Sequence, residues 1–489
     1  MLYVLQVASM LVVLASTFLI FKSFGPRREF LLYTAEEKKE WDKAIGGDVG
    51  AWLTISNIFG TLMSVATVYV FFMGSAKLFG GFSLACVVSI LFGAFVTNVV
   101  TKKICKNKKV CDLLESGGRA GGVIASIFWR DDQSSRKLSG IVKYISIANI
   151  LGVIWLDFTV FTDISSAILN INNVLLQCAV LFAVCYVIFY FVIRYGLRGF
   201  VFADLFQSPL VGLASVAMVL GVVLLFVLGE SVDFSVQKML SPYLSLEQCG
   251  IFVAHVILVN SMLVVVTEPH WLRVWLFGQR ETQLQFKSTA ITAFVWLLLI
   301  IVGLFAAFVI PNKHGEVLIV SFLGMLSDVS YVFLILFWMG STAALFASVD
   351  VQIFSLILVN DFSADSGQII QRRIKSISPS CVALIVSTCF VVVYFVVRSL
   401  NVPIEKIIFI VIPFSFNIMP SLLLLAFGKR QNYRYTCYSL ALYVLCAAVG
   451  LHQRDSEMLW TLLAALVPFV VSCIALVLQP ASDEEYHNG

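Results

Sequence analysis

"YVFLILFWMGSTAALFASVDVQIFSLILV", residues 331–359, is one of the most apolar stretches of the chain, and Asp350 is its only charged residue. A run of about 20 apolar residues is long enough to cross a bilayer as a helix. An ionised carboxylate in hydrocarbon costs a few kcal/mol, so such a residue usually faces a bundle interior or a water-filled cavity. The stretch therefore predicts a membrane-spanning helix with a candidate functional carboxylate at Asp350.

The same apolar character extends over the whole chain. Of its 489 residues, 60% are hydrophobic and 13% are charged, whereas a soluble globular protein carries about 25% charged residues. We therefore expect an all-α protein that crosses the cell (plasma or inner) membrane many times. Thirteen apolar runs have the length of a span, at about 2–21, 52–74, 81–101, 140–166, 172–195, 199–227, 248–267, 289–310, 331–358, 379–398, 405–427, 435–451 and 457–478.

The distribution of Lys and Arg predicts the orientation of these spans. The first basic residue is Lys22, so the leading run lacks the basic start of a cleaved signal peptide, and its N-terminus is expected outside. Counting alternate loops then places 27 of the 33 Lys and Arg inside, most of them in 22–51 and 102–143. A split of 27 to 6 agrees with the positive-inside rule. The C-terminal tail, 479–489, is then expected to be cytoplasmic.

Besides Asp350, three carboxylates lie within predicted spans. Asp157 is deep in "GVIWLDFTVF", which favours a functional role in an ion or proton pathway. Asp163 lies near the outer end of the same run, where a solvated position and a functional one are equally expected. Asp204 is placed at the start of a helix, where capping or gating competes with ion handling.

The run 52–74, "WLTISNIFGTLMSVATVYVFFMG", gathers small and hydroxyl side chains at its middle, including Gly60, Thr61 and Ser64. Such residues allow helices to pack closely. They are also typical of a broken transporter helix, whose unwound backbone carbonyls and hydroxyls face an ion or a solute. Both interpretations remain open from the sequence.

Several strings, taken together, resemble the sodium/solute symporter family. They occur in the family's order and spacing and extend over nearly the whole chain. These strings are "REFLLYTAEEKKEW" (28–41), "GAWLTISNIFGTLMSVATVYVFFMGSAKLFGG" (50–81), "IRYGLRGFVFADLFQSPLVG" (193–212), "TEPHWLRVWLFG" (267–278), "AALFASVDVQIFSLILVNDF" (343–362) and "FSFNIMPSLLLLAFGKR" (414–430).

The resemblance implies a LeuT-like fold built from two inverted repeats of five helices. They would extend over 52–227 and 248–427, with a leading helix in 1–24 and two additional helices in 435–478. Because each repeat has an odd number of helices, the second enters the membrane from the opposite side, which the predicted topology permits.

The resemblance also implies a sodium site between the first and eighth core helices. Its ligands would be the backbone carbonyls of Gly60, Met63 and Ala344, and the side chains at 347 and 348. Ser348 keeps its hydroxyl, but Ala347 supplies no oxygen, so the site is one ligand short unless Asp350 or a water compensates. Asp350 lies about 200° around the helix from Ser348, and so faces elsewhere. The family's acidic residue in the first core helix is replaced by Leu62.

The substrate is less constrained than the fold. The resemblance points to a cavity that includes Thr61, Ser64, Ser261 and Val265. Ser261 and Val265 stand where the proline-carrying branch has aromatic residues, which makes proline an unexpected substrate. His270, which follows Pro269 at a helix end, is expected to be structural.

The function that these features favour is secondary transport of a small polar solute, coupled to sodium or alternatively to protons. A transport-inactive sensor that keeps the fold is the second interpretation, and the missing hydroxyl at Ala347 is consistent with it. An enzyme is not expected, because the sequence contains no HExxH, GxSxG or Walker A motif. The expected partners are the solute and the lipid bilayer, with no nucleic acid and no obligate protein partner.

Overall fold

The computed structural model describes residues 2–24, 47–66, 76–107, 110–112, 122–129, 132–169, 171–228, 235–310, 316–361, 378–400, 404–452 and 457–480. The regular structure of these residues is helical, and they form no β-strand. A helix satisfies its backbone hydrogen bonds internally, which hydrocarbon requires. Ten helical segments in this part of the chain are long and apolar enough to cross a membrane, and four shorter apolar helices accompany them. The chain is a multi-pass membrane protein.

Each of the thirteen predicted spans contains a helix, although several boundaries differ. The end of the predicted span 52–74 and most of the tail 479–489 lie outside the described residues. The helices are α1 (Leu2–Phe24), α3 (Gly47–Leu62), α5 (Ala76–Phe79), η2 (Gly80–Leu84), α6 (Ala85–Cys105), α8 (Val123–Ile127), α9 (Gln133–Ile168), α10 (Val174–Leu228), α11 (Val236–Leu240), α12 (Leu246–Met262), α13 (Glu268–Phe277), α14 (Gln279–Val309), α15 (Glu316–Val329), α16 (Tyr331–Asp361), α18 (Pro379–Ser399), α19 (Ile404–Val411), η3 (Ile412–Ile418), α20 (Met419–Ala426), α21 (Tyr433–His452) and α22 (Glu457–Leu478).

Two predicted spans join into one helix, and one predicted span divides into three. α10 runs without interruption for 55 residues; a straight helix of that length would measure about 80 Å, so it contains two crossings. The predicted span 405–427 consists of α19, the 3-10 helix η3 and α20. Pro413 and Pro420 lie in the first turns of η3 and α20, and a proline lacks the N–H that would continue the preceding α-helix.

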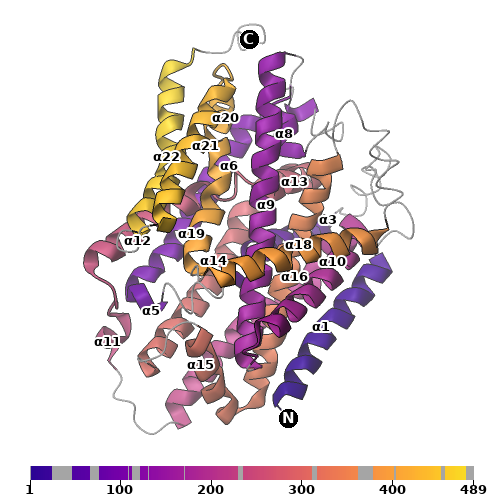
Figure 1. Cartoon of the computed structure of the whole chain (residues 1–489), viewed down its shortest axis with the longest axis vertical. Coiled ribbons are helices and arrows are strands. Elements are labelled where there is room, and N and C mark those ends of the chain that lie inside the picture. Colours follow the sequence, from indigo (N-terminus) through magenta and orange to yellow (C-terminus); the bar gives the residue numbers. More distant parts are fainter. Residues whose placement is uncertain are drawn as a thin grey trace.

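The helices form a bundle around α9, which runs along the long axis of the molecule (Figure 1). α10 packs along α16 and α18, whereas α6 packs against α12 and α14, and α21 against α22. α1 lies on the opposite side of the bundle from α21 and α22 (Figure 1). The first core helix, α3, contacts α10, α14 and α16, which places its C-terminal end in the interior.

Candidate functional site

The α3 helix breaks where the small residues gather. α3 ends at Leu62, Met63 and Ser64 are not helical, and helical backbone resumes at Val65 and Ala66. The structure therefore supports the broken-helix interpretation of this run. A break frees backbone N–H and C=O groups that must find other partners when they are buried.

The carboxylate of Asp157, on α9, meets this break. Its Oδ1 accepts a hydrogen bond from the Ala66 backbone N–H at 3.2 Å, and its Oδ2 accepts one from the Ser348 hydroxyl of α16. Ser64 also hydrogen-bonds to the carboxylate. The side chain of Asp157 is 1% exposed. Three elements far apart in the sequence thus converge on one buried carboxylate.

The residues of the predicted sodium site lie around the same junction. Met63, Ala344, Ala347 and Ser348 are all buried. A Cβ added to Gly60 would lie 3.0 Å from the Ala347 Cβ and 3.4 Å from its carbonyl oxygen. α3 and α16 are therefore in close contact at these two residues. Because the Ser348 hydroxyl donates to Asp157, its lone pairs remain available to a cation.

Asp204 and Asp350 form a second group behind the junction. Asp204 accepts a hydrogen bond from the Asn57 amide at 2.6 Å, and a Cβ on Gly60 would lie 3.2 Å from its Oδ1. Asp350 is fully buried, lies within electrostatic reach of Asp204, and receives no hydrogen bond from a described side chain. The capping role considered for Asp204 is wrong, because α10 continues through it and no helix begins there.

Asp163 is buried and paired, so a solvated position for it is wrong. Its carboxylate forms an ion pair with Arg398 of α18 and accepts a hydrogen bond from the Tyr394 hydroxyl at 2.9 Å. Asp163 is 3% exposed, although it lies only six residues beyond Asp157. Of the two α9 carboxylates, Asp163 is thus paired with a cationic side chain, whereas the described partners of Asp157 are neutral donors.

A buried polar network joins α3 to α13 and α14. Arg273 donates from Nη1 to the Thr61 hydroxyl at 2.8 Å and from Nε to Glu281 Oε1 at 3.1 Å. The ring of His270 lies 3.3 Å from the same Glu281 oxygen and 2.8 Å from the Thr101 hydroxyl. Burial lowers the pKa of His270, while Glu281 opposes this shift. The structure thus places His270 in a network of buried partners, as a structural role requires.

Glu268, the first residue of α13, ties this segment to α8. Its carboxylate accepts hydrogen bonds from the backbone N–H groups of Val123, at 2.5 Å, and Ile124, at 3.0 Å. Burial raises the pKa of Glu268 to about 8, and the two backbone hydrogen bonds oppose this rise.

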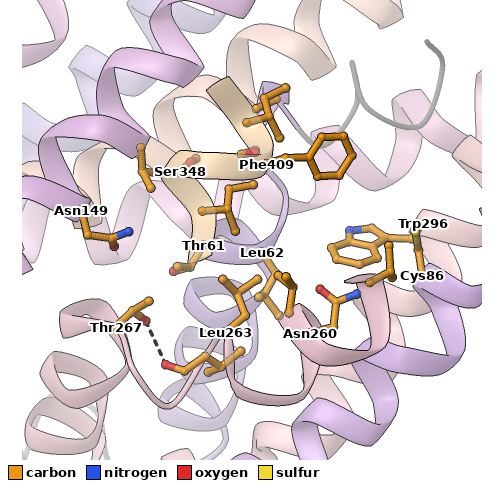
Figure 2. Close-up of a pocket in the computed structure, with 18 of the residues that line it drawn as sticks. Thr61, Leu62, Cys86, Asn149, Asn260, Leu263, Thr267, Trp296, Ser348 and Phe409 are labelled. Atoms are coloured by element: carbon orange, nitrogen blue, oxygen red, sulfur yellow. Dashed lines mark hydrogen bonds between the residues drawn. The ribbon is translucent and has the colours of Figure 1, made fainter. Parts of the chain in front are cut away.

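A cavity of about 200 Å³ lies beside the α3 break, lined by residues of α3, α6, α9, α12, α13, α14, α16, α19 and η3. Figure 2 shows Thr61 and Leu62 between Asn149 and Ser348 on one side and Asn260, Trp296 and Cys86 on the other. Of the predicted cavity residues, Thr61 and Ser64 line it, and so does the sodium-site residue Ser348.

The other two predicted cavity residues, Ser261 and Val265, are not among the lining residues. The Ser261 hydroxyl donates to Leu258 O within α12. Val265 lies in the turn after α12 rather than on the helix, and its carbonyl accepts from the Trp271 indole at 2.8 Å. Their neighbours Asn260 and Val264 line the cavity instead.

Sequence reasoning also missed Asn57, Arg273 and Glu281. All three are at most 1% exposed. Arg273 and Glu281 lie outside the apolar runs, where charged residues are ordinary. Their burial depends on α13 folding back into the bundle, which local hydropathy does not indicate.

Comparisons with known proteins identify the fold. No protein-family model and no curated protein matches the sequence. The structure is similar to that of a substrate-bound, outward-open Na⁺-coupled sialic acid symporter, with 12% sequence identity, a TM-score of 0.61 and coverage of 98% of this chain and 99% of that one. The fold is LeuT-like. Two likenesses are weaker. MhsT in complex with L-phenylalanine has a TM-score of 0.49 and 12% identity, over 88% of this chain and 98% of that one. The nucleobase-cation-symport-1 transporter Mhp1 with bound bromovinylhydantoin has a TM-score of 0.35 and 15% identity, over 90% of this chain and 95% of that one.

Proposed function

We propose that this protein is a secondary active transporter of the sodium/solute symporter family, which moves a small polar solute together with a cation by alternating access. Sodium is the favoured cation, and a proton is the alternative. The LeuT-like fold and the broken helix beside a central cavity support this proposal.

The observation that carries the proposal is the environment of Asp157. Its carboxylate is buried, and its described partners, the Ser348 hydroxyl, Ser64 and the Ala66 N–H, are all neutral. An uncompensated buried charge is strongly destabilising. A cation bound here would neutralise the carboxylate. The carboxylate would also supply to the cation the oxygen ligand that Ala347 lacks.

The same residues would couple the cation to the solute. Ser64, Ala66 and Ser348 each contact Asp157 and also line the cavity. A cation that fixes these residues in one arrangement would change the affinity of the cavity for solute, and the solute would change the cation's affinity by the same factor. One charge moving through 100 mV supplies about 2.3 kcal/mol, which corresponds to a roughly 50-fold concentration ratio of solute.

The remaining features of the proposal follow from the predicted topology. The N-terminus would lie outside and the C-terminus inside, in the cell membrane. The two inverted repeats would extend over 52–227 and 248–427.

The test is sodium-dependent thermal stabilisation of the purified protein, measured against potassium at constant ionic strength. A ligand that binds only the folded state raises stability by RT ln(1 + [L]/Kd). We expect sodium to raise the Tm of the wild type and to have no effect on Asp157→Asn. Asp163→Asn, an isosteric change on the same helix, should lower the starting Tm and keep the sodium response.

A sodium response that survives in Asp157→Asn would contradict the proposed site. If sodium has no effect and acidification stabilises the wild type more than Asp157→Asn, the coupling ion is a proton. If sodium has no effect and the two proteins respond equally to acidification, the transport-inactive interpretation replaces the proposal.

A further inference from the structure

Several polar side chains around the cavity already use a donor within the protein. The amide nitrogen of Asn149 donates to Val411 O at 3.2 Å, and that of Asn260 donates to the Ser89 hydroxyl at 2.7 Å. The hydroxyls of Ser348 and Thr267 donate to Asp157 and to Val264 O. The amide oxygens of Asn149 and Asn260 are therefore left to receive hydrogen bonds from a bound solute.

Two further lining residues contain buried polar atoms without a hydrogen-bond partner. Gln352 is 7% exposed and His255 is 4% exposed. Gln352 Oε1 and His255 Nδ1 have no hydrogen-bond partner among the described residues. Gln352 Oε1 can only accept, and a buried acceptor without a donor is costly, so a solute that donates hydrogen bonds would be stabilised here.

The charges near the cavity do not favour an anionic solute. Arg273 is the only Lys or Arg that lines it among the described residues. Its guanidinium is bound to Glu281 and lies within electrostatic reach of Asp204, so two carboxylates already balance it. Asp157 lies directly behind the wall formed by Ser64, Ala66 and Ser348. A cation bound at Asp157 would be neutralised by this carboxylate, so the wall offers an anionic solute no unbalanced positive charge.

The opposite part of the wall is apolar and aromatic. Phe252, Trp296 and Phe409 line it, and the rings of His255 and Phe409 meet edge to face at 5.1 Å. A cavity of about 150 Å³ holds a benzene ring, so about 200 Å³ leaves room for a ring with a short side chain. A polyol is polar on every side, so it does not match a cavity with one polar and one apolar wall.

We infer that the solute is an organic amine: a protonated amino group on an apolar body about the size of one ring. The amino group donates to the oxygens of Asn149 and Gln352 on the side nearest Asp157, and the ring packs against Trp296 and Phe409. This inference rests on the proposed function, whose transported solute it specifies by chemical class.

Equilibrium binding to the purified wild type, with sodium present, tests the inference without a transport assay. The probes are matched in shape and differ in charge: phenethylamine, 2-phenylethanol, 3-phenylpropionate and the zwitterion phenylalanine, with glucose as the polyol. We expect phenethylamine to raise the Tm and to bind at least about tenfold more tightly than the alcohol, since hydrogen bonds to a charged group are the stronger ones. The carboxylate should not bind.

Variants of Gln352 test where the amino group lies. Gln352→Glu adds a carboxylate of the same shape and should tighten phenethylamine binding roughly tenfold, while Gln352→Leu should weaken it several-fold. Gln133→Glu, at the exposed start of α9, adds the same net charge away from the cavity and should change nothing.

Preferential binding of the carboxylate, the zwitterion or glucose would overturn the amine assignment. So would the absence of binding by every probe at millimolar concentrations to a protein that still shows its sodium response. Loss of the sodium response itself would instead count against the proposed function.

Discussion

The four buried aspartates have different surroundings. Asp157 accepts hydrogen bonds from neutral donors of two other elements, and Asp163 pairs with Arg398. Asp204 accepts from Asn57, whereas Asp350 receives nothing from the described side chains. Such differences decide which carboxylate attracts a cation, because the free energy of a buried charge depends on its partners.

Restoring the hydroxyl at 347 should strengthen the cation site. Ala347→Ser adds an oxygen beside Gly60, and we expect a higher apparent affinity for sodium in the thermal-shift titration. Ser348→Ala should weaken sodium binding by about 1–3 kcal/mol, the order of one lost ion–oxygen contact. If Ser348→Ala titrates like the wild type, Ser348 is not part of the site.

Glu268 should make stability depend on pH. Its pKa is raised from 4.5 to about 8 by burial, so between these values the folded protein holds a proton that the unfolded chain has lost. This contribution to stability is therefore complete below about pH 4.5 and is lost as the pH rises to about 8.

Glu268→Gln should remove that pH dependence, since a glutamine oxygen still accepts from Val123 and Ile124 but does not ionise. Tm values measured from pH 5 to 9 should fall less steeply for this variant than for the wild type. Glu247→Gln, at an exposed position of α12, is the control and should follow the wild type. Parallel curves for the wild type and Glu268→Gln would show that Glu268 does not titrate in this range.

At the scale of elements, the contact between α3 and α16 depends on the absence of a side chain at Gly60. This contact brings the broken part of α3 close enough to α16 for Ser348 and Ser64 to reach the same carboxylate. α6 and α12 also pack closely, since a Cβ added to Gly93 would lie 1.9 Å from the Asn260 carbonyl oxygen. Small residues permit such close packing in membranes, where helix association depends on van der Waals contact.

Gly60→Ala should therefore lower stability and weaken the sodium response. The added Cβ would lie 3.0 Å from that of Ala347 and 3.2 Å from Asp204 Oδ1, and overpacking of this kind costs about 1–3 kcal/mol. Gly250→Ala in α12 meets nothing within 4 Å and should be neutral or stabilising by about 0.5–1 kcal/mol. Equal Tm values for the two variants would show that the α3–α16 contact adjusts without cost.

At the scale of the whole molecule, the start of α1 and the end of α22 lie at opposite ends of the long axis (Figure 1). Thirteen predicted spans, an odd number, predict termini on opposite sides of the membrane. The charge distribution predicts which terminus faces the cytoplasm, because the loops predicted to be inside carry 27 of the 33 Lys and Arg.

This orientation predicts the accessibility of Cys105 and Cys111. Both are partly buried, and the Cys111 thiol hydrogen-bonds to the Cys105 carbonyl at 2.7 Å, so labelling should be slow. An impermeant thiol reagent should leave them unmodified in intact cells and modify them after permeabilisation, as read by mass spectrometry of the labelled peptides. Modification in intact cells would show that these cysteines face outward and that the predicted topology is wrong.

The sequence by itself determined the helical class and the approximate spans. These features depend on local composition: hydrocarbon excludes unsatisfied backbone, so a long apolar run predicts a helix wherever it occurs. For 52–74 the sequence left close packing and a broken helix open, and the structure shows the break at Met63 and Ser64.

Only the tertiary structure decided which polar groups meet. Asp157 and Ser348 are 191 residues apart, and Thr61 and Arg273 are 212 apart. The sequence left a solvated and a functional position open for Asp163, and the resemblance implied Ser261 in the cavity. The fold pairs Asp163 with Arg398 and turns the Ser261 hydroxyl back into α12. Hydropathy is a property of neighbouring residues, whereas the partner of a buried charge is set by how distant helices pack.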